Sequence, residues 1–171
     1  MIRKGRFIVT EMMVSPAGAL LALDLWDADN DIAAAQVLGM ALPEPGRSAA
    51  GALGTALRVG PRRWWLDGAG FAPGAIVSGL NGTGAVTPVG GGLVRVQLSG
   101  ARWHEVIMAS GLIDAEDPGF GPGSVAVTAL HHARCVLHVR AAALCEVYLP
   151  ASYAEHCLSA WRDMGWQQVA A

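Results

Sequence analysis

The chain has 171 residues, of which 53% are apolar and only 15% charged, and its formal net charge at pH 7 is -2. This length predicts one domain or two small ones with a real hydrophobic core. The charge balance shows no basic field, which argues against nucleic acid as a partner. Ordinary soluble proteins carry roughly 25% charged residues. The low charge predicts that another protein covers much of the surface; the alternative is a monomer rich in Ala and Gly.

The N-terminal stretch MIRKGRFIVTEMMVS is a poor signal peptide, because Thr10 and Glu11 interrupt its apolar run. The nearby apolar run AGALLAL is far too short to cross a bilayer. Cys135, Cys145 and Cys157 form no CxxC pair, which predicts free thiols in a reducing compartment. We therefore expect a cytoplasmic protein without a membrane segment or a disulfide framework.

Hydrophobic patterning predicts strands and helices in both halves of the chain. In the first half, strands are expected at 6–13, 18–26, 53–60 and 63–68, and helices at 30–39 and 73–82. In the second half, strands are expected at 93–98, 124–130, 135–139 and 144–149, and helices at 99–111 and 152–165. Val94, Val96 and Leu98 should share one buried face of their strand. Residues 124–130 are apolar on both faces, which is typical of a central strand.

Several residues mark the expected helix ends. Pro73 in the first turn of its helix and Asn81-Gly82 at the end are typical of helix boundaries. Ser99 is expected to cap the next helix, and Gly111 to end it in a left-handed conformation. Ser152 and Glu155 form a predicted capping box.

A strand–helix–loop–strand–strand–helix order occurs twice, as a weak internal echo. It predicts two similar α+β halves, residues 1–83 and 84–171, within one compact subunit. Strands that run as hairpins with helices on one face define the α+β class, here with antiparallel strands.

The stretch VGPRRWWLDG at residues 59–68 places Arg62, Arg63, Trp64 and Trp65 side by side. Successive side chains of a strand point to opposite faces, so one tryptophan should enter the core and the other, with one arginine, should lie outside. Trp and Arg are enriched at interface hot spots, although core and surface packing would also explain the stretch. We predict a protein interface that involves these residues.

No pattern in the sequence predicts catalysis, cofactor binding or a metal site. His131, His132 and Cys135 fit no short zinc pattern, and neighbours on a strand point apart. His138 is expected to be a partly buried residue with its polar groups paired. The three cysteines fall on predicted core faces, where thiols are inert. The glycines at 90–92 and 119–123 match neither dinucleotide nor phosphate-loop spacing.

Stretches between about residues 53 and 165 resemble the gamma subunit of heterotetrameric sarcosine oxidase, in the family of the folate-binding aminomethyltransferase T-protein. The matching landmarks, in the family's order, are Leu98-Ser99-Gly100, Asp114, Pro122-Gly123, Thr128-x-Leu130 and Ser152-Tyr153-Ala154-Glu155. Ala101 replaces a proline that is frequent in the family, and Ala151 replaces a frequent arginine. Trp103 is unusual on its helix and joins the predicted interface residues.

The resemblance implies an α+β fold like the N-terminal domain of T-protein, in a four-chain complex with alpha, beta and delta subunits. FAD, FMN, NAD and tetrahydrofolate would lie in the larger subunits and zinc in the smallest. The implied chemistry is oxidative demethylation of sarcosine to glycine. The gamma chain itself is expected to be non-catalytic, to hold no cofactor, and to serve assembly and stability.

Three alternatives remain open at the level of sequence. The complex could act on another N-methyl amino acid. The chain could be a free-standing folate-binding or one-carbon transfer domain, for which Asp114 is the only candidate carboxylate, without a basic cluster beside it. It could also be a small scaffold unrelated to folate.

Overall fold

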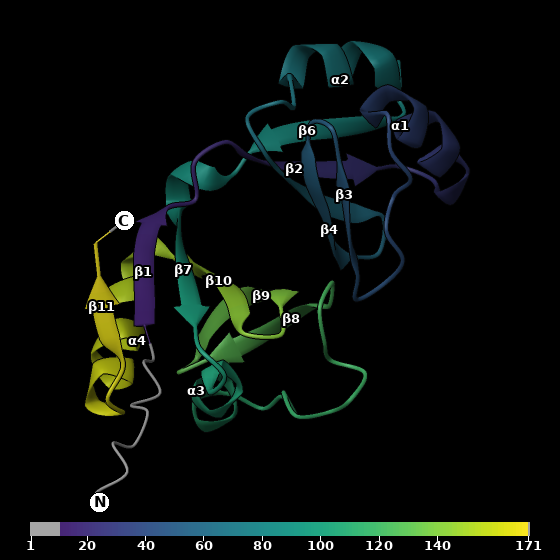
Figure 1. The fold of residues 1–171 in the computed structure, drawn as a ribbon. Coiled ribbons are helices and arrows are strands. Elements are labelled where there is room, and N and C mark those ends of the chain that lie inside the picture. Colours follow the sequence, from purple (N-terminus) through teal and green to yellow (C-terminus); the bar gives the residue numbers. More distant parts are fainter. Residues whose placement is uncertain (1–10, 171) are drawn as a thin grey trace, which may run out of the picture.

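The computed structural model describes residues 11–170, which form two mainly antiparallel sheets with helices on one face of each (Figure 1). The five-stranded sheet contains β2 (Leu20–Leu25), β3 (Ser48–Gly51), β4 (Gly54–Gly60), β5 (Arg63–Asp67) and β6 (Gly84–Pro88), in the order β3-β4-β5-β2-β6. The six-stranded sheet contains β1 (Glu11–Pro16), β7 (Leu93–Ser99), β8 (Val125–Leu130), β9 (Ala133–Ala141), β10 (Leu144–Pro150) and β11 (Gln167–Val169), in the order β11-β1-β7-β10-β9-β8. The helices are α1 (Asp31–Leu38), α2 (Pro73–Leu80), α3 (Trp103–Ser110) and α4 (Ala151–Asp163), with short 3₁₀ turns η1 (Ala28–Asn30) and η2 (Gly90–Gly92). The predicted α+β class is confirmed.

The chain passes between the two sheets twice. β1 pairs with β7 in the six-stranded sheet, whereas β2 through β6 build the other sheet before the chain returns in β7. β6 pairs with β2 in antiparallel register, with Leu23 opposite Val86. The predicted boundary between residues 83 and 84 therefore does not coincide with the division between the sheets, which falls after β1 and again after β6.

Strand alternation gives each sheet one face that packs against helices. In the five-stranded sheet this face buries Leu21, Leu23, Trp64 and Leu66 against residues of α1 and α2. In the six-stranded sheet it buries Val96, Leu98, Cys145, Val147 and Leu149 against residues of α3 and α4. Val94 packs against the same cluster, which confirms the predicted common face of β7.

The opposite faces of the two sheets pack against each other. Their shared cluster contains Ala17, Leu20, Leu57, Val59, Val125, Val136 and Tyr148, with partly buried Trp65, Val89 and Leu93 beside it. Both sheets are thus covered on both faces over part of their length. The prediction that residues 124–130 form a central strand is wrong: β8 is an edge strand that pairs only with β9 in its sheet. Its sequence is apolar on both faces because one face packs against the other sheet.

Three predicted helix ends are wrong. Ser99 closes β7, and α3 begins only at Trp103 because a turn with Gly100 at φ 119° lies between them. Gly111 is extended, with φ -148°, and bridges to β8 instead of ending the helix in a left-handed turn. Ser152 is already inside α4, which begins at Ala151, so no capping box forms.

The ends of α2 and the extent of β1 can also be compared with the sequence. α2 begins at Pro73 and is followed by Asn81 in the left-handed conformation, as predicted. Of the strand predicted at residues 6–13, only the part from Glu11 onward lies within the described residues, and β1 continues to Pro16.

Replacing Gly90 with alanine should lower the free energy of unfolding by about 1–3 kcal/mol, the usual cost of overpacking a tight site. A Cβ added to Gly90 would lie 2.0 Å from the backbone oxygen of Gly18, where the two connections between the sheets meet. The matched control is Gly91→Ala, because nothing lies within 4 Å of a Cβ at Gly91. Chemical denaturation of both variants measures the difference, and equal stabilities would contradict the close approach.

Candidate functional site

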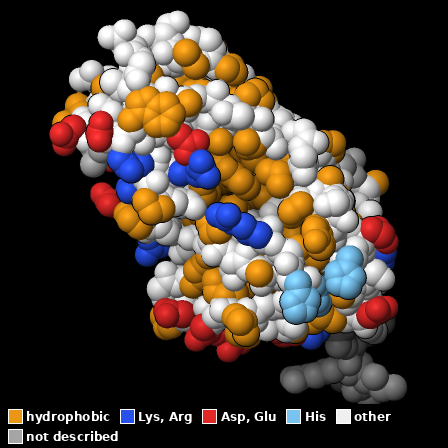
Figure 2. Space-filling view, turned by 180° about the vertical axis from the view of Figure 1, so that it is seen from behind, with side chains coloured by type: hydrophobic (Ala, Val, Ile, Leu, Met, Phe, Trp, Pro, Cys, Tyr) orange, Lys and Arg blue, Asp and Glu red, His pale blue; other side chains and the backbone are white. Residues whose placement is uncertain are grey.

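A cavity of about 430 Å³ opens between the sheets, where β2, β5 and β6 face β8, β9 and β10. We call it the inter-sheet cavity. Its apolar lining includes Val59, Trp65, Leu93, Val127, Val136 and Tyr148. On the face drawn in Figure 2, hydrophobic side chains gather in a hollow between basic ones. Ligand pockets are commonly of this size and are lined mainly by apolar and aromatic groups.

The aromatic part of the cavity comes from both sheets. Trp65 of β5 and Tyr148 of β10 lie edge to face, with ring centroids 5.7 Å apart and an interplanar angle of 75°. Aromatic pairs favour this arrangement because the positive edge of one ring meets the negative face of the other. The pair is a contact between the two sheets. Trp65 is only partly buried, so part of its ring is exposed to the cavity.

Three charged residues line the cavity: Asp24 of β2, Arg63 of β5 and Arg134 of β9. Arg63 Nε lies 2.5 Å from Asp24 Oδ1, and the hydrogen bond and charge of Asp24 raise the pKa of the Arg63 guanidinium. None of the ion pairs within the described part of the chain includes Arg134, which is exposed. The cavity therefore has one cation more than it has carboxylates.

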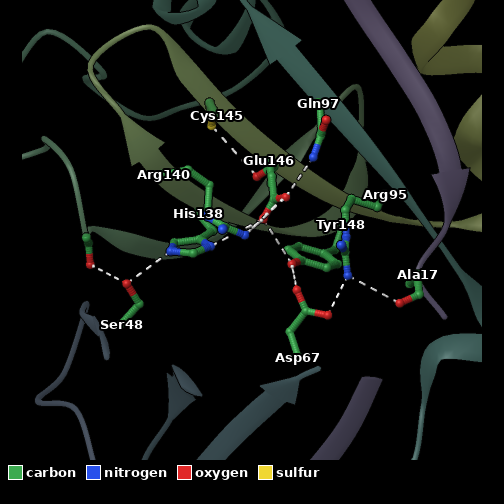
Figure 3. A network of polar contacts seen from close by, with 11 residues as sticks. Ala17, Ser48, Asp67, Arg95, Gln97, His138, Arg140, Cys145, Glu146 and Tyr148 are labelled. Carbon is green, nitrogen blue, oxygen red and sulfur yellow. Dashed lines mark hydrogen bonds and ion pairs between the residues drawn. The ribbon is translucent and has the colours of Figure 1, made fainter. Parts of the chain in front are cut away.

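A buried polar network lies next to the inter-sheet cavity and connects β5, β7, β9 and β10 (Figure 3). Arg95 of β7 lies 2.5 Å from Asp67 of β5 and so joins the two sheets by an ion pair. The Tyr148 hydroxyl lies 2.9 Å from Asp67 Oδ2 and 3.2 Å from Glu146 Oε2, so two carboxylates compete for its single proton. Burial and these two carboxylates raise the pKa of Tyr148.

Glu146 is the centre of this network and is 1% exposed. Gln97 Nε2 donates to Glu146 Oε1 at 3.1 Å, and Arg140 lies 3.4 Å from Oε2. His138 Nδ1 also lies 3.4 Å from Oε2, within ion-pair distance but without a regular hydrogen bond. Burial by itself would raise the pKa of Glu146, but His138, Gln97 and the charges of Arg140 and Arg95 outweigh it and lower the pKa to about 2. The carboxylate is therefore ionised at neutral pH and satisfied by its neighbours, which is typical of a structural group.

The two tryptophans of the RRWW stretch lie on opposite faces of β5, as the strand period predicted. Trp64 is the buried one, with 0% exposure in the core beneath α1 and α2. Its Nε1 donates to the Pro43 carbonyl at 3.3 Å, and the Arg58 guanidinium carbon lies 4.8 Å from the ring centroid. Trp65 and Arg63 both line the inter-sheet cavity, where Trp65 is partly buried and Arg63 is exposed.

Arg62 lies in the turn between β4 and β5 with a left-handed φ of 54°. It donates to the carbonyl of Trp26, a residue that the sequence analysis did not single out, and lies 3.9 Å from Asp27. The Trp26 side chain is 53% exposed, and its Nε1 donates to the Gly82 carbonyl at 2.9 Å. Arg62 and Trp26 thus form a small exposed pair at one end of the five-stranded sheet. The only signal for this pair in the sequence was a tryptophan at the end of the strand predicted at residues 18–26.

Trp103 does not lie on the surface, so its predicted place in an interface is wrong. It is 4% exposed and belongs to the core between the six-stranded sheet and α3. Its Nε1 donates to the Ala142 carbonyl at 3.0 Å, which satisfies the only polar group of the ring. In the sequence, Trp103 shares one helical face with the apolar residues Val106 and Ile107. This spacing indicates a core position for the tryptophan.

The remaining candidate residues are structural or exposed. All three cysteines are buried, as predicted, and burial raises the pKa of Cys135 to about 12. Within residues 11–170, no three His, Cys, Asp or Glu side chains lie together in a way that could hold a metal ion. Asp114 is exposed, accepts the backbone N–H of Glu116 at 3.0 Å and does not line the inter-sheet cavity. No described helix is both long and apolar enough to span a membrane.

Comparison with known proteins identifies the fold. No family model and no curated protein sequence matches the chain. Among solved structures, the chain is similar to one in a heterotetrameric sarcosine oxidase from Corynebacterium sp. U-96 in complex with pyrrole 2-carboxylate, with a TM-score of 0.78 and 18% sequence identity. The match covers 88% of this chain and 80% of that one. A regulatory subunit of aspartate kinase from Thermus flavus matches with 16% identity over 91% of this chain and 97% of that one, but its TM-score of 0.46 is too low to support an argument.

Proposed function

We propose that this chain is the gamma-type subunit of a heterotetrameric, flavin-dependent sarcosine oxidase and that it serves assembly and stability without catalytic residues of its own. The observation that carries the proposal is the fold similarity over 88% of the chain to a chain of such a complex. The two coverages together mean that the matched chain is only slightly longer than this one. The ordered landmarks between residues 53 and 165 support the gamma assignment.

In the proposed complex, the alpha, beta and delta subunits supply the chemistry. FAD, FMN, NAD and tetrahydrofolate would be held in the larger chains and zinc in the smallest, and sarcosine would be demethylated to glycine. Another N-methyl amino acid is the alternative substrate. The contribution of this chain would be a rigid surface, for which two sheets joined by a buried ionic network are suited.

The proposal is tested by purifying the affinity-tagged chain from its own host. We expect three companion chains in fixed proportion, a flavin absorption band, and oxygen uptake that depends on sarcosine. An untagged host strain controls for proteins that bind the resin. A chain that is recovered alone, as a stable monomer, from cells that contain sarcosine oxidase activity would contradict the proposal. If the complex forms but oxidises another N-methyl amino acid, the subunit role stands and the substrate changes.

Replacing Trp26 with alanine should weaken assembly by about 2 kcal/mol or more while leaving the fold intact, the behaviour of an interface hot spot. Trp26 is half exposed beside Arg62, and Trp and Arg are the residues most enriched at such positions. Co-purification yield and thermal unfolding of the variant measure the two effects. Tyr153→Ala is the matched control, because Tyr153 on α4 is also an exposed aromatic, at 49%. Equal yields from both variants would place the interface elsewhere than at Trp26.

A further inference from the structure

The inter-sheet cavity is a space that the packing of the two sheets does not fill. The shared cluster closes the contact around Leu57 and Tyr148, but beyond Val59 and Val136 the sheets leave about 430 Å³ open. Its lining is mostly apolar, and open apolar surface between two rigid sheets is costly to keep in contact with water. A cavity of this size can hold a small organic molecule.

The two walls of the cavity repeat one arrangement of side chains. On β5, Arg63 is two residues from Trp65, and on β9, Arg134 is two residues from Val136. Residues two apart on a strand share a face, so each wall presents an exposed arginine beside a more deeply placed apolar side chain. The cavity therefore offers an apolar interior and a cationic mouth.

Only one of the two guanidinium groups is available to a ligand. Arg63 already pairs with Asp24, which is the only acidic side chain among the described residues that line the cavity. Arg134 takes part in none of the ion pairs between described residues. Its planar fork of donors matches a carboxylate in a bidentate manner. Trp65, edge to face with Tyr148, offers partly exposed aromatic surface for a flat ligand body.

We propose that the inter-sheet cavity binds a small organic anion: a flat, apolar body against Trp65, with a single carboxylate paired with Arg134. This site is independent of the subunit role proposed above, because none of its groups is needed for assembly through Trp26 and Arg62. The ligand class follows from the net charge of the lining and from the partly exposed ring of Trp65.

Three probes of one shape and different charge test the proposal on the purified full chain: 2-naphthoate, 2-naphthylmethanol and 2-naphthylmethylamine. Isothermal titration calorimetry should show saturable binding of naphthoate, binding of the neutral alcohol that is weaker by about tenfold or more, and no binding of the amine. A hydrogen-bonded charge pair accounts for a difference of that size. Binding of the three probes with equal affinity, or of none of them to the folded chain, would overturn the proposal.

Two variants and one control locate the site. Arg134→Gln should lower the affinity for naphthoate about tenfold and leave that for the alcohol unchanged. Thr87→Trp places a ring into the cavity from an exposed position and should abolish binding of both, with an unchanged thermal midpoint. Arg162→Gln, on α4 outside the cavity, should change neither affinity. If naphthoate binds Arg134→Gln as tightly as the unchanged chain, the assigned carboxylate partner is wrong. Assembly assays on the same variants keep this outcome separate from the subunit role.

Discussion

Replacing Trp64 with alanine should lower the free energy of unfolding by about 3–5 kcal/mol, the usual cost of removing a large buried aromatic side chain. The ring is fully buried between the five-stranded sheet and the helices α1 and α2, so its removal leaves a cavity that rigid strands cannot close. The variant also loses the hydrogen bond to the Pro43 carbonyl and the contact with Arg58.

The matched variant is Trp65→Ala, from the same strand and the same residue type. Trp65 is only partly buried and borders an existing cavity, so its truncation should cost clearly less than that of Trp64. Urea denaturation followed by circular dichroism gives both values without depending on the fluorescence of the removed ring. Equal losses would mean that the two faces of β5 are packed alike, and the distinction between core and cavity at this strand would be wrong.

Periodicity predicted much of the fold because it reports local geometry. The alternation of Val94, Val96 and Leu98 identified the buried face of β7, and hydrophobic patterning located the four helices. These patterns require only that one side of an element is apolar. They therefore yield the elements and the α+β class without any knowledge of which elements meet.

What periodicity could not predict is the second face of each sheet. Arg95 and Gln97 alternate with apolar residues, as they would on a strand whose polar side faces water. In the structure this side faces the other sheet, where Arg95 pairs with Asp67, 28 residues away in sequence. Whether a polar face meets water or a complementary polar face depends on contacts between distant strands, which no local pattern reports.

The candidate site escaped the sequence analysis for the same reason. Arg63 and Trp65 belong to one sheet and Arg134 to the other, and only the packing of the sheets brings them to one cavity. The two-residue spacing of Arg63 and Trp65 was visible and predicted that they share a face. It did not show that this face meets a second part of the same chain. The short strands β3, β6 and β11 were also missed, because three to five residues rich in Ala, Gly, Pro or Gln carry no clear apolar alternation.

Replacing Glu146 with alanine should cost about 3–5 kcal/mol of folding free energy, because it removes the central carboxylate of a buried ionic network. Arg140 and His138 would each lose the carboxylate 3.4 Å away, and Gln97 would lose its acceptor. Glu155→Ala is the control: Glu155 forms an exposed ion pair with Arg162, and such pairs contribute about 0–1 kcal/mol. Similar losses in both variants would contradict a structural role for the buried network.

Glu146 should also determine how stability falls in acid. Its pKa is about 2 in the folded chain against an ordinary value of 4.5, so the unfolded chain takes up the proton first as the pH falls. The contribution of the carboxylate is therefore complete above pH 4.5 and is lost progressively down to pH 2, by about 3 kcal/mol in total. Urea denaturation at a series of pH values should show this loss in the unchanged chain, and a clearly shallower slope in Glu146→Ala, which has no proton to bind at this site. If the free energy of unfolding fell equally steeply with pH in both chains between pH 4.5 and 2, other carboxylates would be responsible for the loss of stability in acid. The network would then not hold Glu146 ionised.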